Sequence, residues 1–424
     1  MVISLVILLA TMTLGLPIYL ALLFSGLYVL AVLDVPAGFV IATLYDGVYK
    51  FALLAVPFFI LAGVLIERTS FSERLIDYAL KWSKKVRGGI PISGVIANEF
   101  FGTVSGSSAA ATGTVGKILF PVIAESEGES FAVGLLTSAG ALAIVMPPSI
   151  TMVLYGAVVN VSVGKLFLTG IIPALIIGFI LSVYIVWRAK PVTKKAREWK
   201  PMEKKGVSSL RNSIAIVSVF FLPVLVLGGI YGGIFTPTES AAVAVIYVVL
   251  IALFILKEIN FKLILSSLSE GSRLTCQIFV LIAASSVFSQ ALTMAQVPQK
   301  LVNICQGLSP MMFLIVLNTV LIFVGMFFDP ASAVLVLAPI VAPVASAIGI
   351  DLIHLGIVFT VNIAIGMFTP PFGLNLFVSQ AVFKKSLEEI AKSLIPFWVW
   401  YLVALAIITF LPEIYMWVPN MLLK

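Results

Sequence analysis

Two stretches with one shared feature decide the fold: Gly140-Ala-Leu-Ala-Ile-Val-Met-Pro-Pro-Ser149 and Asn362-Ile-Ala-Ile-Gly-Met-Phe-Thr-Pro-Pro-Phe-Gly373. Each is apolar and is interrupted by a Pro-Pro pair. Proline lacks the backbone N–H and its ring clashes with the preceding turn, so each pair predicts a helix that stops and restarts. In hydrocarbon, such a break is tolerated only where protein or a water-filled cavity meets the freed polar groups.

The composition identifies an integral membrane protein. The 424 residues are 61% hydrophobic and 11% charged, with a mean hydropathy of +1.17, whereas a soluble protein carries about 25% charged residues. Apolar runs of spanning length recur along the whole chain, which favours α-helices over a barrel. The N-terminus lacks the pattern of a cleavable signal, so we expect none. The basic residues lie between apolar segments and indicate cytoplasmic anchors rather than nucleic-acid binding.

Two classes of site are disfavoured by residue usage. Cys276 and Cys305 are far apart, and His354 is the single histidine. This set fits neither a disulfide framework nor a zinc or haem site. Gly113-Thr-Val-Gly-Lys117 resembles a phosphate loop only superficially, because Ala111 and Ile118 stand where that motif needs Gly and Ser or Thr. We expect no organic cofactor and no enzymatic activity.

The hydropathy pattern predicts two similar halves joined by a basic loop and one extra span. The predicted first half, 1–187, contains a span or scaffold region (1–66), an interfacial arm helix (70–88), a hairpin (92–126), a broken helix (130–158) and a span (165–187). The loop 188–211 carries nine Lys or Arg and is expected to be cytoplasmic, and 212–233 is a linking span. The predicted second half, 235–424, contains spans at 237–256 and 274–294, an arm (258–272), a short amphipathic piece (297–308), a hairpin (311–349), a broken helix (352–382) and the last span (387–411).

The hairpins are predicted to be re-entrant. The arms that flank Val104-Ser-Gly-Ser-Ser-Ala109 are shorter than the roughly 20 residues needed to cross a bilayer. The halves align with Pro370 on Pro147, an offset of 370 − 147 = 223 residues. An odd number of crossings between them makes the second half inverted, which places the two hairpin tips near the midplane from opposite sides. The competing interpretation is a chance alignment of apolar stretches that contain prolines.

The assembled motifs resemble a known family. The motifs that carry the resemblance are Gly102-Thr-Val-Ser-Gly-Ser-Ser-Ala-Ala110, Ala143-Ile-Val-Met-Pro-Pro-Ser149 and Gly366-Met-Phe-Thr-Pro-Pro-Phe-Gly373. With them, the chain resembles the large membrane subunit of tripartite ATP-independent periplasmic (TRAP) transporters over essentially its full length. The resemblance implies an all-α polytopic membrane protein with an inverted repeat, two re-entrant hairpins, two broken helices and an elevator-type ion-transporter fold. It also implies sodium-driven uptake of an organic acid across the bacterial inner membrane, with a small four-helix membrane subunit and a periplasmic substrate-binding protein as partners.

Hydroxyls and backbone carbonyls near the hairpin tips are candidate ligands for Na⁺, a hard cation that prefers oxygen. The candidates for sodium are Ser105, Ser107, Ser108, Gly140, Val145, Asp329, Ser332, Gly366 and Thr369. Two alternatives stay open: small residues also promote close helix packing in membranes, and Asp329 is also a suitable N-cap for the following helix.

The helices that restart after each break present free amides and a positive dipole end, which suit a carboxylate. The candidates for the substrate site are Pro147, Ser149, Thr151, Pro371, Gly373 and Asn375. Two further charged groups are interpreted structurally: Glu99 and Lys117 as a pair between the arms of the first hairpin, and Glu239 as a capping acid.

Three other functions compete with this interpretation. A stand-alone sodium-coupled anion or dicarboxylate symporter of the same architecture would need neither partner protein. An intramembrane protease is disfavoured, since there is no His-Glu-x-x-His and no second aspartate near Asp329. A passive membrane scaffold would have no use for two hairpins. The sequence does not disclose which acid is carried.

Overall fold

The structure is a computed structural model that describes residues 2–83, 86–189, 209–305 and 307–422. Every regular element in these ranges is helical. The predicted basic loop lies almost wholly at 190–208, outside the described residues.

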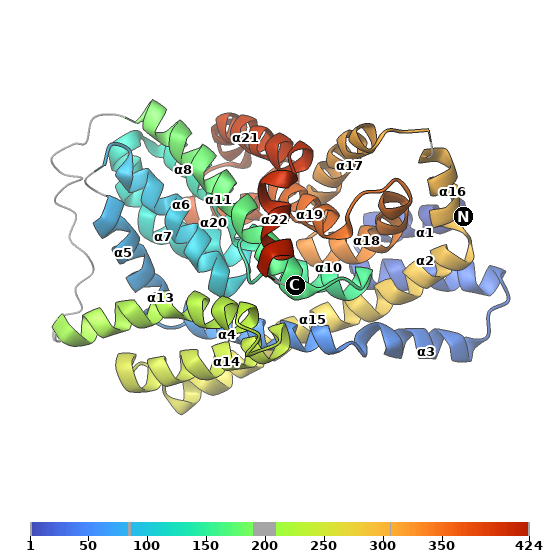
Figure 1. The fold of residues 1–424 in the computed structure, drawn as a ribbon, viewed down its shortest axis with the longest axis horizontal. Coiled ribbons are helices and arrows are strands. Elements are labelled where there is room, and N and C mark those ends of the chain that lie inside the picture. The colour runs from blue at the N-terminus through green and yellow to red at the C-terminus, as the bar shows by residue number, and fades with distance from the viewer. Residues whose placement is uncertain (1, 84–85, 190–208, 306, 423–424) are drawn as a thin grey trace.

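The helices form two layers (Figure 1). The base layer contains α1 (Val2–Thr13), α2 (Ile18–Val32), α3 (Ala37–Val48), η1 (Phe51–Leu54), α4 (Ala55–Glu67), α13 (Ser209–Tyr231), α14 (Pro237–Leu250), η2 (Ile251–Leu256) and α15 (Phe261–Met294), of which α3, α4, α13 and α14 run along the bottom of that view. The hairpin layer contains α6 (Gly89–Ser105), α7 (Ser108–Glu127), α8 (Glu129–Ala139), α9 (Leu142–Val145), α10 (Ile150–Val159), α11 (Val163–Arg188), α17 (Pro310–Gly325), α18 (Pro330–Ala347), α19 (Leu352–Met367), α20 (Leu374–Phe383), α21 (Leu387–Phe410) and α22 (Glu413–Leu422). The amphipathic helix α5 (Phe71–Ser83) is the predicted interfacial arm 70–88, and α16 (Val297–Cys305) is the predicted short amphipathic piece 297–308.

Both predicted hairpins and both predicted breaks are present. The first hairpin is α6 and α7 around Gly106, whose left-handed φ of +59° only glycine adopts freely. The second is α17 and α18. Each break holds a cis Pro-Pro bond, Pro147-Pro148 and Pro370-Pro371.

The structure differs from the predicted boundaries in three places. The predicted arm 258–272 and span 274–294 form one continuous 34-residue helix, α15, because the polar residues at their junction include no proline to break it. Helix α3, at 37–48, is a separate element within the predicted region 1–66, and its continuation α4 is bent from it by 55°. Helix α22 follows the last predicted span.

Five of the described helices are long and apolar enough to cross a membrane, or up to seven spans if each bent pair counts as one. Pro330–Ala347 is among the five, so length alone does not distinguish this hairpin arm from a span.

The two halves have matching helix ends and caps, and each packs one helix against the hairpin of the other half. Asn160 and Lys384 end α10 and α20 with left-handed φ, and Ser162 and Ser386 then cap the next helices, both pairs at an offset of 224 residues (384 − 160 and 386 − 162). The first part of each broken helix contacts its own hairpin, α9 on α6 and α19 on α17. The restarted part crosses over: α10 packs on α18 and α20 packs on α7 (Figure 1). The repeat therefore builds one interlocked layer rather than two separate domains.

Candidate functional site

Two near-identical backbone contacts hold the broken helices against the hairpins. A Cβ at Gly102 of α6 would lie 2.5 Å from Cα of Ala143, and a Cβ at Gly325 of α17 would lie 3.1 Å from Cα of Gly366. These pairs are related by the repeat, since 325 − 102 and 366 − 143 both equal 223. The first contact leaves no room for a Cβ at Gly102, and the second leaves none at Gly366, where a Cβ would lie 2.4 Å from the Gly325 carbonyl carbon. Gly102 and Gly366, the second of which is a predicted site residue, therefore serve close packing of the broken helices on the hairpins.

The three serines of the first tip point in different directions. Ser105 Oγ donates to Glu67 Oε1 of α4 at 3.2 Å, toward the base layer. Ser107 is the N-cap of α7 and accepts from the Ala110 amide at 3.3 Å. Ser108 Oγ donates to Asn375 Oδ1 of α20 at 2.8 Å, and both residues are buried. The predicted serine cluster is thus spread over three contacts.

Asn375, a predicted substrate contact, links the two halves. Its amide also donates to the Thr137 carbonyl at 3.2 Å, and Thr137 exchanges a 2.7 Å hydrogen bond with Ser379. All three residues are fully buried. The first hairpin, α8 and α20 therefore share one polar network, and its α20 residues follow the second break in the chain.

Asp329 adopts the N-cap role that the sequence leaves open. Its Oδ1 accepts the amides of Ala331 and Ser332 at 3.0 and 3.2 Å, and its Oδ2 accepts the Ser332 hydroxyl. The cap occupies both carboxylate oxygens at the start of α18.

The two restarted helices lack the side-chain caps that many of the other helices have. Neither α10 at Ser149 nor α20 at Gly373 has such a cap. Ser149 Oγ instead donates back to the Ile144 carbonyl at 2.6 Å. Side chains cap the described helices α7, α11, α14, α15, α17, α18, α19 and α21. The first-turn amides of α10 and α20 therefore have no side-chain cap, although Leu376 in the first turn of α20 donates to the Gly373 carbonyl at 2.9 Å.

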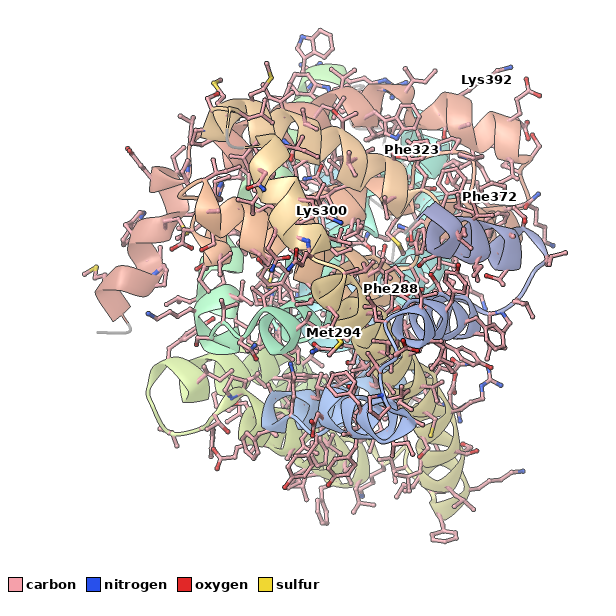
Figure 2. The ribbon with its side chains drawn as sticks, turned by 90° about the vertical axis from the view of Figure 1, so that its right-hand side faces the viewer. Phe288, Met294, Lys300, Phe323, Phe372 and Lys392 are labelled. Carbon is pink, nitrogen blue, oxygen red and sulfur yellow. The ribbon has the colours of Figure 1, made fainter. Side chains whose placement is uncertain are left out.

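The two breaks differ in exposure. Pro147 and Ser149 are buried, and the Pro147 ring lies against Gly170 of α11. Pro371 and Phe372 of the second break are exposed. The Phe372 ring meets Phe327 at the second tip, 5.5 Å between centroids, and Figure 2 shows Phe372 and Phe323 on one face of the molecule.

Each predicted ion site lies beside a fully buried side-chain oxygen that has no hydrogen-bond partner in the described part of the chain. Thr112 Oγ1 lies against Gly140, and Asn362 Oδ1 lies one helical turn before Gly366. Buried polar atoms are nearly always paired. The two oxygens lie on α7 and α19 and are not related by the repeat, but each is consistent with a ligand beside it. Among residues 2–83, 86–189, 209–305 and 307–422, no cluster of three His, Cys, Asp or Glu exists.

The remaining predicted residues lie at the same breaks. Val145 ends α9, Thr151 is in the first turn of α10, and both are buried. Thr369, in the second break, donates its hydroxyl to the Ile365 carbonyl at 2.6 Å.

One predicted pairing is wrong and one predicted cap is confirmed. Glu99 is buried with Oε1 unpartnered against Gly178, while Lys117 is exposed, because the two residues lie on different faces of the hairpin. Glu239 forms a capping box with Thr236 at the start of α14.

Two contacts were not predicted from the sequence. Asn362 donates to Asn318 Oδ1 at 2.7 Å, and Asn318 in turn donates to Thr409 at 3.1 Å and joins α17, α19 and α21. Lys50 donates to the Ala157 carbonyl of α10 at 2.7 Å. A lysine inside an apolar run, as Lys50 is, was the available signal for the second contact.

Comparisons with known proteins agree with this architecture. Residues 5–414 match the family described as the tripartite ATP-independent periplasmic transporter, DctM component. The chain belongs to that family. It is 40% identical over 374 residues to the C4-dicarboxylate TRAP transporter large permease protein DctM of Pseudomonas aeruginosa, covering 86% of this chain and 85% of that protein.

Two further similarities extend the comparison. The isethionate TRAP transporter permease protein DctMQ of Oleidesulfovibrio alaskensis is 32% identical over 362 residues, covering 84% of this chain and 56% of that protein. The crystal structure of the Alcanivorax borkumensis YdaH transporter, described as having an unusual topology, has the same fold at a TM-score of 0.62 and 14% identity, covering 88% of each chain. This DctM-family chain is thus a multi-pass membrane transporter subunit with the paired hairpin and broken-helix fold.

Proposed function

We propose that this DctM-family subunit carries a small organic acid across the bacterial inner membrane, driven by Na⁺. The observation that carries the proposal is the pair of uncapped helix N-termini at Ser149 and Gly373, each beside a Pro-Pro break. Free amides at the positive end of a helix dipole favour a carboxylate. Pro147, Ser149, Thr151, Pro371, Gly373 and Asn375 are the proposed walls of the substrate site.

Na⁺ is proposed to bind at the hairpin tips. The ligands would come from the hydroxyls of Ser105, Ser107, Ser108, Ser332 and Thr369, the Asp329 carboxylate and the backbone of Gly140, Val145 and Gly366. The unpartnered oxygens of Thr112 and Asn362 support this position. Carboxylate, hydroxyl and carbonyl oxygens all suit a hard cation.

The hairpin layer is proposed to move as an elevator against the base layer. Its interlocked packing, in which α10 and α20 cross between the hairpins, supports movement as one body.

Two partners are proposed: a small four-helix membrane subunit and a periplasmic substrate-binding protein. The relative named DctMQ, of which this chain covers 56%, supports a membrane partner by its name and its additional length. A stand-alone anion symporter of the same fold is the competing function.

Uptake by reconstituted vesicles tests the function. The vesicles contain the complete transporter and its binding protein, and radiolabelled succinate, isethionate and lactate are offered one at a time under an inward Na⁺ gradient. We expect one acid to accumulate, and accumulation to stop when K⁺ replaces Na⁺. Equal uptake in K⁺ would refute sodium coupling. Full uptake after omission of the binding protein would favour the stand-alone symporter.

A further inference from the structure

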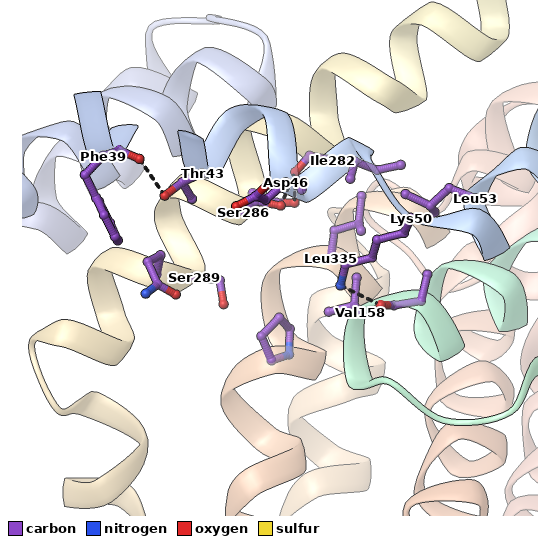
Figure 3. A pocket seen from close by; sticks show the side chains of 15 residues that line it. Phe39, Thr43, Asp46, Lys50, Leu53, Val158, Ile282, Ser286, Ser289 and Leu335 are labelled. Carbon is purple, nitrogen blue, oxygen red and sulfur yellow. Dashed lines mark hydrogen bonds between the residues drawn. The ribbon is translucent and has the colours of Figure 1, made fainter. Parts of the chain in front are cut away.

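A polar crevice separates the two layers at a place distinct from the breaks. The cavity holds about 310 Å³ and lies between α3 and α15 of the base layer and α10 and α18 of the hairpin layer (Figure 3). Its polar lining residues are Thr43, Asp46, Lys50, Ser285, Ser286, Ser289 and Gln290. In so apolar a chain, a polar cavity between packed layers marks a place for water or a polar solute.

Lys50 joins the layers across this crevice. It follows α3 in the base layer, and its ammonium donates to the carbonyl of Ala157 near the C-terminal end of α10 (Figure 3). The terminal carbonyls of a helix carry partial negative charge, so they attract a cation. Any sliding of α10 against α3 must break this contact.

The ammonium retains capacity for a stronger partner. A lysine has three donors, and the Ala157 carbonyl is the acceptor recorded for Lys50. Asp46, four residues earlier, lines the same crevice but forms no ion pair with Lys50 in the described part of the chain. The bond from the Lys50 ammonium to a carbonyl is charge-assisted by the donor alone, whereas a carboxylate acceptor adds the Coulomb attraction of a full opposite charge. A solute carboxylate in the crevice would therefore compete effectively with a neutral carbonyl.

We propose that the crevice is a transit site for the substrate carboxylate, and that Lys50 exchanges the Ala157 carbonyl for that carboxylate. The exchange binds the acid and releases the contact between the layers in one event. This inference rests on the proposed uptake of an organic acid, and it assigns a recognition residue outside the breaks.

The first test compares charge-removing and charge-keeping variants in the vesicle assay, with whichever carboxylic acid of the panel, succinate or lactate, is accumulated; accumulation of the sulfonate isethionate alone would overturn the carboxylate site. Lys50→Met should raise KM about tenfold, the size of one lost hydrogen bond to a charged group, whereas Lys50→Arg should stay within about threefold of the original. Lys300→Met is the matched control, because Lys300 also donates to a helix-end carbonyl, that of Ala295 at 3.4 Å, but the contact does not cross the crevice. An unchanged KM in Lys50→Met would overturn the proposal, whereas failure of every acid in the unmodified transporter would refute the proposed function instead.

A second test excludes misfolding as the cause. In a background with Cys276→Ser and Cys305→Ser, Lys50→Cys is treated with a cationic aminoethyl methanethiosulfonate or with a neutral reagent of similar size. The cationic reagent should restore most of the uptake and the neutral reagent should not. Equal restoration by both reagents would show that size rather than charge matters, and would refute the carboxylate site.

Discussion

At the scale of single residues, substitution of Ser108 tests whether its hydrogen bond to Asn375 helps to hold the two halves together. Ser108→Ala leaves the buried Asn375 Oδ1 without this donor. An unsatisfied buried acceptor costs about 1–3 kcal/mol, so we expect a clearly lower melting temperature of the detergent-solubilised protein. Ser182→Ala is the control, because Ser182 only donates to the Gly178 carbonyl of its own helix. Equal effects of the two changes would contradict the assignment.

Asp329 allows its capping role to be separated from a role in ion binding. Asparagine is as good an N-cap as aspartate, so Asp329→Asn should retain the melting temperature while it removes the charge. Asp329→Ala should cost about 0.5–2 kcal/mol through loss of the cap. If Asp329 helps to bind Na⁺, the Asn variant requires more Na⁺ for half-maximal uptake. An unchanged Na⁺ titration in this stable variant would leave Asp329 as a cap alone.

At the scale of elements, the two glycine contacts explain why each broken helix lies so close to its hairpin. Gly102→Ala would place a methyl group 2.5 Å from the Ala143 backbone. Such overpacking costs about 1–3 kcal/mol, and because the neighbour is backbone, it is relieved only by moving the helices apart. We expect a lower melting temperature and loss of most uptake. Gly325→Ala would place its methyl group 3.1 Å from Cα of Gly366, so the same two effects should appear there in smaller size.

The control for both variants is Gly228→Ala. Gly228 lies within α13, and a methyl group added there would meet no atom within 4 Å outside the backbone of its own helix. Because alanine favours a helix over glycine by about 0.5–1 kcal/mol, this change should leave the melting temperature equal or higher. A similar loss in all three variants would show that the glycines at the breaks have no special role.

The elements could be predicted from the sequence where one local signal determines them. The Pro-Pro pairs indicated both breaks, and the short arms around Gly106 and Asp329 indicated both hairpins. Partner choice could not be predicted, because the crossing of α10 to α18 and of α20 to α7 depends on long-range packing of uniformly apolar faces. Helix α3 was not predicted within the long apolar region 1–66, and the two predicted pieces of α15 are joined because the polar residues between them include no proline. At the site, residue types were predictable but side-chain directions were not: Ser105 and Ser108 are three residues apart, yet they contact Glu67 and Asn375 in different layers.

At the scale of the whole molecule, the two layers are joined at polar contacts that an elevator must break. One is the hydrogen bond from Ser105 at the first hairpin tip to Glu67 of α4. If the hairpin layer slides against the base layer, a covalent link here stops transport, whereas a link inside one layer does not. A link inside one layer can be placed between Ser4 of α1 and Ser25 of α2, both in the base layer, whose hydroxyl oxygens lie 2.7 Å apart.

The experiment places cysteine pairs at both positions in the background that lacks Cys276 and Cys305. Glu67→Cys with Ser105→Cys, joined by a short bifunctional methanethiosulfonate, should lose nearly all uptake and regain it on reduction. Ser4→Cys with Ser25→Cys should keep its uptake when linked. Undiminished uptake by the linked pair at Glu67 and Ser105 would rule out sliding of the layers at this contact. Transport would then require the second hairpin tip to open locally while the rest of the hairpin layer stays fixed. The link between Glu67 and Ser105, at the first tip, does not restrain that motion.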